Sequence, residues 1–247
     1  MDKNLNLVIT KFKEKTKKQC FSYTLSEEKA EITDSKLGGL PYMKEDEDYP
    51  LDSSGKPMPL LAQINFADID LENYPKTGLL QIFTENPLSY PVEYKIKYVE
   101  DISSKPNKNL TKIGLTTFVI EEEMKLNIIP DIAYMPFSDY RFNGILKEIL
   151  HEVYGSDDNL ENIIDVILNN IEPQSGLIGG YADFTQNDPR TNKPTKTHLS
   201  ECIIKIDSYL NINKIFLGDA GIAWLLISEE DLKAKRLENA EFDWDCY

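Results

Sequence analysis

Apolar and polar residues alternate with a period of two along several short stretches of the chain, which is the pattern of half-buried β-strands. The clearest stretch is 92–98, Val-Glu-Tyr-Lys-Ile-Lys-Tyr, where every second residue is charged. One buried face and one solvated face are typical of antiparallel sheets. Similar patterns predict further strands at 21–25, 60–64, 78–84, 115–120, 199–206, 221–227 and 237–244.

Helical periodicity occurs at the start of the chain. Leu5, Val8, Ile9 and Phe12 follow the i, i+3, i+4, i+7 spacing of one helix face, with lysines on the other face. A basic amphipathic helix can lie on a membrane. Here the apolar stripe is short and the protein is acidic, so we expect this helix to pack on the protein's own core.

A helical hairpin is predicted in the middle of the chain, between about 138 and 173. Ser138 can cap its first helix and Gly155 can end it. Ser156 or Asp157 can cap the second helix, and Pro173 stops it. A shorter helix is predicted after Ser228, where Ser-Glu-Glu-Asp resembles a capping box.

Residues 41–59 contain four prolines and the acidic run Glu-Asp-Glu-Asp at 45–48. So many helix and strand breakers predict a long irregular segment. Long loops inside compact domains are often functional lids. A connection between strands, held in place by its prolines, explains the same composition equally well.

Three short features occur twice in the same order. Ser-Lys-Leu-Gly-Gly at 35–39 resembles Ser-Gly-Leu-Ile-Gly-Gly at 175–180, and two strand-like segments downstream are also echoed. The spacings are 141, 142 and 143 residues (38 to 179, 62 to 204, 78 to 221). A long repeat present only twice favours a duplicated half-domain over a solenoid.

Together these patterns predict a single domain over 1–247, with repeat halves at about 30–130 and 172–245. The expected fold class is α+β and β-rich. Mostly antiparallel, roll-like sheets come from the two duplicated halves, with the helical hairpin inserted between them and a helix at the N-terminus.

The composition, 41% hydrophobic and 28% charged, is that of a soluble globular protein. The longest apolar run is too short for a membrane span, and the first residues lack the apolar core of a signal peptide. Three widely spaced cysteines argue against a disulfide framework and for a reducing cytoplasm. A net charge of −15 disfavours nucleic acid and anionic membranes, and it favours a basic protein partner.

No high-specificity catalytic motif is present. His151 is interpreted as a half-buried packing residue on the mid-chain helix. His198 and Cys202 are four residues apart, so in a strand they would share a face and could form a nucleophile pair. A buried structural thiol is the simpler interpretation of Cys202. Four aspartates near turns, which include Asp188, could converge on a cation, but turn hydrogen bonds explain them better, and we expect no metal and no cofactor.

The segment 179–190 has the composition of a binding site. Its glycines permit close backbone approach, its aromatics offer flat contact surfaces, and its polar residues supply directed hydrogen bonds. If the halves are symmetric, the glycine turns at 38–39 and 179–180 could flank one cleft. The candidate ligand-binding residues, from both halves, are Gln63, Tyr181, Asp183, Gln186, Arg190, Asp207 and Asp219.

The same segments resemble the YwqG family, a bacterial group described as a domain of unknown function (DUF1963). The resemblance covers about 30–245 and rests on 35–41, 61–65, 78–83, 179–181 with Gln186, 206–208 and 218–227. Family members usually carry Trp where this chain has Tyr49 and often Pro where it has Ala182. The resemblance implies a β-rich, roll-like fold from two related halves and implies no activity.

The preferred functional interpretation is a non-enzymatic cytoplasmic protein that binds another protein. A concrete form is an immunity-type protein that neutralises a basic toxin or enzyme by charge complementarity. The alternative is a small-ligand-binding protein or hydrolase that uses the glycine-turn cleft of the second half.

Overall fold

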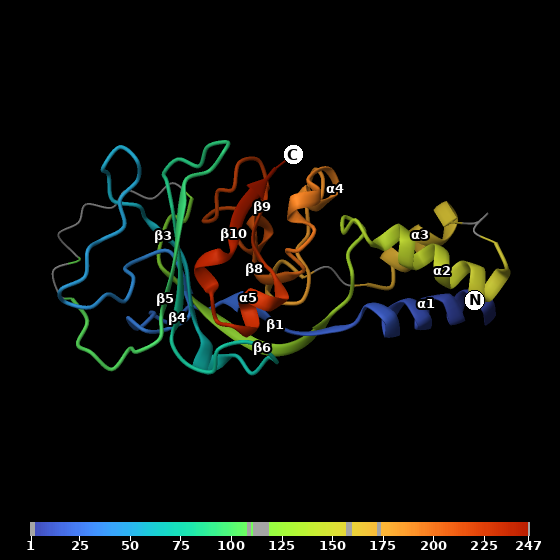
Figure 1. Cartoon of the computed structure of the whole chain (residues 1–247), viewed down its shortest axis with the longest axis horizontal. Helices are drawn as coiled ribbons and strands as arrows, with labels where there is room; N and C mark the ends of the chain where they lie inside the picture. The colour runs from blue at the N-terminus through green and yellow to red at the C-terminus, as the bar shows by residue number, and fades with distance from the viewer. Residues whose placement is uncertain (1–2, 108–109, 111–118, 157–159, 172–173, 247) are drawn as a thin grey trace.

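The computed structural model describes residues 3–107, 110, 119–156, 160–171 and 174–246 (Figure 1). Ten of its strands form one antiparallel sheet in the order β10-β9-β8-β7-β1-β6-β2-β3-β4-β5. These strands are β1 (Lys18–Leu25), β2 (Lys36–Leu37), β3 (Leu60–Asn65), β4 (Leu79–Thr84), β5 (Tyr94–Val99), β6 (Met124–Ala133), β7 (Gly176–Gly179), β8 (Glu201–Asp207), β9 (Ile222–Ile227) and β10 (Glu241–Asp245).

The sheet curls until it is nearly closed, like a barrel. Tyr94 on one edge strand, β5, packs edge-on against Phe242 on the other edge strand, β10, with 5.8 Å between ring centroids. The main apolar core is shared by both halves of the sheet. The expectation of an α+β, β-rich and antiparallel fold is confirmed.

The strands are arranged symmetrically about the centre of the sheet. β1 and β6 form the central pair, with β7 to β10 following on the β1 side and β2 to β5 on the β6 side. On the β1 side, Ile178 lies opposite Phe21. On the β6 side, Leu37 lies opposite Met124. Phe21 and Met124 are each three residues from the Thr24–Asn127 pair of the β1–β6 ladder, so the pairing pattern has a pseudo-twofold axis at that pair.

Details of the outer ladders follow the same symmetry. The β3–β4 ladder shifts register between Leu60 and Ala62, and the β8–β9 ladder shifts between Cys202 and Ile204. A short 3₁₀ turn follows each of the strands that contain these shifts. Strand β3 is followed by η1 (Phe66–Asp68), and β8 is followed by η4 (Ser208–Leu210). The side chain of the last strand residue caps each turn. The caps are Asn65 and Asp207.

The alternation pattern did not predict β6. This strand carries Pro130, a residue that central strands avoid because it has no N–H. Leu126 donates its N–H to Ser35, so every second residue from 126 onward directs its backbone to the β2 side. β2 is two residues long and pairs only with Met124 and Lys125 of β6. Pro130 therefore lies on a part of β6 whose edge on that side is open. The N–H of Ile132 on that edge binds the Asp131 carboxylate at 2.7 Å, which makes the edge a poor template for another strand.

Helices α1 (Lys3–Thr16), α2 (Phe142–Tyr154) and α3 (Leu160–Leu168) form a second layer at one end of the sheet (Figure 1). They enclose their own apolar cluster, in which the rings of Phe12 and Phe142 lie 4.9 Å apart. The predicted N-terminal helix and its inward face are confirmed. Within the described residues, no helix has the length and apolar character needed to cross a bilayer.

Some of the predicted helix ends are correct and one is wrong. Gly155 ends α2 with a φ of 77°, and Ser228 caps α5 (Glu229–Lys233) through the N–H of Asp231, both as predicted. Ser138 does not cap α2, because Arg141 occupies that position without a side-chain cap bond. Residues 157–159 and Pro173 lie outside the described residues, as does most of the predicted strand 115–120.

The proline-rich segment 41–59 contains no regular helix or strand ladder, only short bridges such as Leu51 to Pro57. Tyr42, Met43 and Met58 in it are almost fully buried. This segment is therefore a packed connection between β2 and β3, and its acidic residues 45, 46 and 48 are exposed.

Candidate ligand-binding site

A cavity of about 350 Å³ lies between the sheet and the helical layer. Small-molecule sites usually have volumes of roughly 300–1,000 Å³. Two hollows elsewhere have larger volumes, about 740 and 620 Å³, but no buried charged side chain lines them. The lining comes from five places in the chain: the segment 134–138 after β6, the region around the end of α3, the start of β7, the segment 181–184, and Lys205 of β8.

Lys205 is the charged residue that distinguishes this cavity. Its exposed fraction is 4%, although it lies within an apolar strand. Its ammonium is 4.0 Å from Oδ2 of Asp183, which is longer than a hydrogen bond. No closer acceptor for this ammonium is found in the described part of the chain. Burial of a weakly paired charge is unfavourable, so its presence beside a cavity needs an explanation.

Asp183 is held in place by contacts on its other side. Its Oδ1 accepts hydrogen bonds from the hydroxyl of Ser138 and from the N–H of Phe184, the latter at 3.0 Å. These bonds orient Oδ2 toward Lys205. The cavity wall therefore presents one cation and one carboxylate oxygen side by side.

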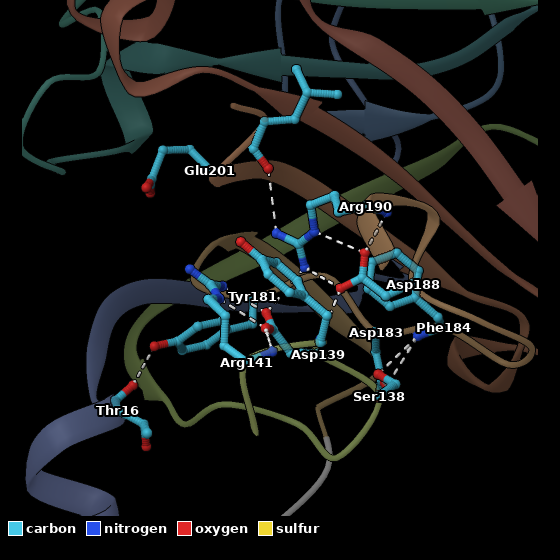
Figure 2. Close-up of polar contacts among 12 residues, drawn as sticks. Thr16, Ser138, Asp139, Arg141, Tyr181, Asp183, Phe184, Asp188, Arg190 and Glu201 are labelled. Carbon is cyan, nitrogen blue, oxygen red and sulfur yellow. Dashed lines mark hydrogen bonds and ion pairs between the residues drawn. The ribbon is translucent and has the colours of Figure 1, made fainter. Parts of the chain in front are cut away.

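A network of four charged residues supports this wall, with Asp139, Asp188 and Arg190 buried and Arg141 half-buried (Figure 2). Arg190 binds Asp188 with two hydrogen bonds of 2.8 and 2.7 Å, and it also binds Asp139 at 3.0 Å. Arg141 binds Asp139 through two further bonds of 2.8 and 2.6 Å. Two guanidinium groups thus neutralise two carboxylates. The network joins the segment after Ser138 to the segment after Phe184.

The pKa of Asp139 reflects this arrangement. Burial acts to raise the pKa, but the hydrogen bonds from Arg141 and the charge of Arg190 outweigh it, and the pKa is lowered. Asp139 therefore stays ionised at neutral pH, and its ion pairs contribute to stability above its usual titration range.

Tyr181 connects the cavity to the start of the sheet. Its hydroxyl donates to the carbonyl of Thr16, the last residue of α1, at 2.7 Å (Figure 2). The ammonium of Lys18 lies 5.0 Å from its ring centroid. Burial raises the pKa of Tyr181 to about 12. The residue is therefore a neutral wall of the cavity.

The structure brings two of the sequence-predicted site residues, Tyr181 and Asp183, together at the cavity. Arg190 lies behind the wall in the charge network. Asp207 caps η4, and burial raises its pKa, with Asp183 as a further charge that acts in the same direction. These residues form or surround one region, although only the first two line the cavity.

The other three predicted residues lie elsewhere. Gln186 is exposed and donates to the carbonyl of Cys246 at 2.8 Å. Asp219 is exposed in the turn before β9. Gln63 is fully buried in the other half of the sheet, where its side chain accepts from the N–H of Tyr42 and from Gln81. It also donates to two backbone carbonyls, so its hydrogen bonds explain its position without a ligand.

The two glycine turns do not flank one cleft. Both have positive φ, as at Gly38 and Gly179, which explains the glycines. Gly38 follows the residue paired with Met124, while Gly179 pairs with Cys20, which lies opposite Asp131. Seven residues of β6 separate these points, a distance of about 24 Å. The hypothesis of a shared cleft is therefore wrong.

The proposed His198–Cys202 pair is also wrong. β8 begins at Glu201, so His198 lies before the strand and is exposed. Cys202 is buried, and burial raises the pKa of its thiol to about 12. This thiol is protonated at neutral pH and packs as an apolar side chain. His151 is exposed rather than half-buried. In the described part of the chain, no three potential metal ligands form a cluster.

Sequence reasoning did not find Lys205, Ser138, Asp139 or Arg141. Lys205 had a signal: it is the one charged residue among Ile203, Ile204 and Ile206. The other three had none, because Ser138 and Asp139 bind residues 45 and 51 positions later in the chain, and Arg141 joins the site only through Asp139.

Comparison with known proteins now places the chain. The family model described as "Domain of unknown function (DUF1963)" matches residues 35–246. The chain belongs to the DUF1963 family. This DUF1963 match includes the curled sheet from β2 onward and both sides of the cavity. No curated protein matches the chain.

We expect substitution of Arg190 by Met to reduce the free energy of unfolding by about 3–5 kcal/mol, because the buried carboxylate of Asp188 would lose its guanidinium partner and that of Asp139 would lose one of two. Urea denaturation at neutral pH measures this change. Arg236→Met is the matched control, since Arg236 pairs with Asp231 and Glu230 on the surface, where solvent screens the ion pairs, and its loss should reduce stability much less. Equal effects of the two substitutions would contradict a structural role for the network.

Lys36 and Lys205, which are both buried, should respond differently to substitution by Met. Lys36 pairs with Glu123 at 3.0 Å, so Lys36→Met should lower the free energy of unfolding by roughly 1–3 kcal/mol. Lys205→Met should leave stability unchanged or raise it, because it removes a weakly paired buried charge. Thermal and urea unfolding of both variants test this. A large loss of stability in Lys205→Met would assign Lys205 to the architecture.

Proposed function

We propose that this protein binds a small organic molecule in the cavity lined by Lys205 and Asp183. The observation that carries the proposal is the buried ammonium of Lys205, which lines a cavity of about 350 Å³ and has its nearest carboxylate at 4.0 Å. Functional sites often retain groups that reduce stability, because a ligand completes their interactions.

The symmetry of the sheet supports this proposal when the two halves are taken as a duplication. Gln63 lies opposite Gln81 in one half, and Lys205 lies opposite Trp224 at the equivalent place in the other. In the first half, the four hydrogen bonds of Gln63 close the position. In the second half, the equivalent position faces a cavity. We therefore propose that one copy kept a structural role while the other became a binding site.

Binding is favoured over hydrolysis by the state of the potential nucleophiles. The hydroxyl of Ser138 donates to Asp183 Oδ1, which also accepts from the N–H of Phe184, and none of the described residues that line the cavity is a histidine. The Cys202 thiol is protonated at neutral pH. The residues around the cavity thus have the character of a binding wall.

Narrowing the cavity should abolish binding. Leu168 lines the cavity at the end of α3 and is 39% exposed, so Leu168→Trp should fill the opening without overpacking the core. Leu7→Trp on α1 is the matched control, since Leu7 is an exposed helical leucine outside the cavity. Saturation-transfer NMR against a library of neutral and charged metabolite-sized compounds should detect ligands of the wild type.

We expect those ligands to lose at least about tenfold in affinity for Leu168→Trp, equivalent to about 1.4 kcal/mol, and to bind Leu7→Trp normally. Ligands that bind both variants equally would show that the cavity is not the site. A wild type that binds nothing in the library would also contradict the proposal.

The surface favours a second candidate function, the neutralisation of a basic protein in the cytoplasm. The net charge is −15, and Glu45, Asp46 and Asp48 are exposed together on the connection between β2 and β3. Clustered acidic residues accelerate association with a basic partner and make it sensitive to salt. An immunity-type protein would use its surface in this way.

This second candidate predicts one stoichiometric basic partner. Affinity capture from the native lysate, with elution in rising salt, should release that partner. The triple substitution of Glu45, Asp46 and Asp48 by Lys should weaken the purified complex and reduce the dependence of its association rate on salt. A complex that is insensitive to both changes would exclude the electrostatic mechanism.

A further inference from the structure

We propose that the ligand of this cavity is a zwitterionic α-amino acid with a large apolar side chain. This inference rests on the proposed ligand-binding function and specifies its chemistry. It follows from the charges on the cavity wall, from the balance of charges around it and from the apolar remainder of the lining.

The first argument is the pair of opposite charges on the wall. The ammonium of Lys205 and Oδ2 of Asp183 are 4.0 Å apart, beyond direct hydrogen-bonding distance. A ligand with only an anionic group would bind Lys205 but would meet the charge of Asp183. A ligand with only a cationic group would meet Lys205 instead. In an α-amino acid the ammonium and the carboxylate are bonded to the same carbon. Its carboxylate can therefore bind Lys205 while its ammonium binds Asp183.

The second argument is that the charges around this pair disfavour a ligand that is only anionic. Arg190 and Arg141 are neutralised by Asp188 and Asp139 in the charge network. Two further acidic groups are half-buried nearby: Asp207 lies near Lys205 and Asp183, and Asp131 accepts a hydrogen bond from the cavity residue Gln174. The protein as a whole carries a net charge of −15, which disfavours a free anion. A carboxylate that binds Lys205 is therefore matched best when the ligand also carries a cation, as a zwitterion does.

The third argument is the rest of the lining. Beyond its charged pair, the cavity is lined mainly by aliphatic and aromatic side chains from both layers. Burial of an apolar group of the ligand against such a wall contributes favourably to the free energy of binding. The side chain of the amino acid would lie against Met135, Leu168, Ile171, Leu177 and Phe184.

Four probes that share one aromatic body separate the contributions of the charges. L-Phenylalanine carries both charges, 3-phenylpropionate only the carboxylate, 2-phenylethylamine only the ammonium, and 3-phenylpropanol neither. Isothermal titration of the full chain at neutral pH should give the highest affinity for L-phenylalanine. Because a hydrogen bond to a charged group contributes roughly 1.5–3 kcal/mol, we expect the two singly charged probes to bind at least about tenfold more weakly.

Two variants assign the charges to residues. Lys205→Met should reduce the affinity for L-phenylalanine at least about tenfold and leave 2-phenylethylamine unaffected or improved. Asp183→Asn keeps an oxygen for Ser138 and Phe184, and it should weaken L-phenylalanine while leaving 3-phenylpropionate unaffected or improved. Lys36→Met, which replaces a buried lysine outside the cavity, should bind all four probes as the wild type does.

Each outcome decides the matter. The inference is supported if both variants lose affinity for L-phenylalanine, while Lys205→Met still binds 2-phenylethylamine and Asp183→Asn still binds 3-phenylpropionate. Equal binding of 3-phenylpropanol and L-phenylalanine, blocked by Leu168→Trp, overturns the zwitterion and leaves the ligand-binding function intact. Tighter binding of 3-phenylpropionate than of L-phenylalanine overturns it in favour of an anionic ligand. No binding of any probe also overturns it, and the library screen then judges the ligand-binding function separately.

Discussion

The architecture depends on the antiparallel ladder between β1 and β6. Eight residue pairs, from Lys18–Ala133 to Leu25–Leu126, join the two groups of outer strands at the centre of the sheet. Each strand of this ladder carries one meander on its outer side. Because the groups attach at symmetric points, the sheet can curl evenly until its two edges meet around a common core. A change in the register of this ladder would displace both halves at once.

The second constraint is the treatment of buried charge. The Arg190 network satisfies its charges internally, so it can be buried and still position the wall of the cavity. Lys36 is likewise paired closely with Glu123. Lys205 differs from both because its nearest carboxylate is beyond hydrogen-bonding distance. The contrast between paired and weakly paired buried charges is what separates the candidate site from ordinary architecture.

The sequence was sufficient for the fold class, and for most of the strands whose side chains alternate between core and solvent. It was insufficient for β6, because Pro130 breaks the pattern and is tolerated only where β2 leaves an open edge. The candidate site was predicted in part. Tyr181 and Asp183 lie in a segment with a recognisable composition, whereas Asp139 and Arg141 are joined to it only by tertiary contacts. The role of Gln63 depends on carbonyl groups whose positions no local pattern specifies.

The central ladder also affects how the chain reaches its folded state. β1 pairs with a strand that lies about a hundred residues later in the chain, so the ribosome must complete both β6 and the first meander before β1 has its first partner. Contacts between residues so distant in sequence slow folding, since a long loop must close before the contacts stabilise it. Until then β1 and the edge of β2 that pairs with β6 are unprotected. The emerging chain is therefore most vulnerable to aggregation, and most dependent on chaperones, while its first half is being synthesised.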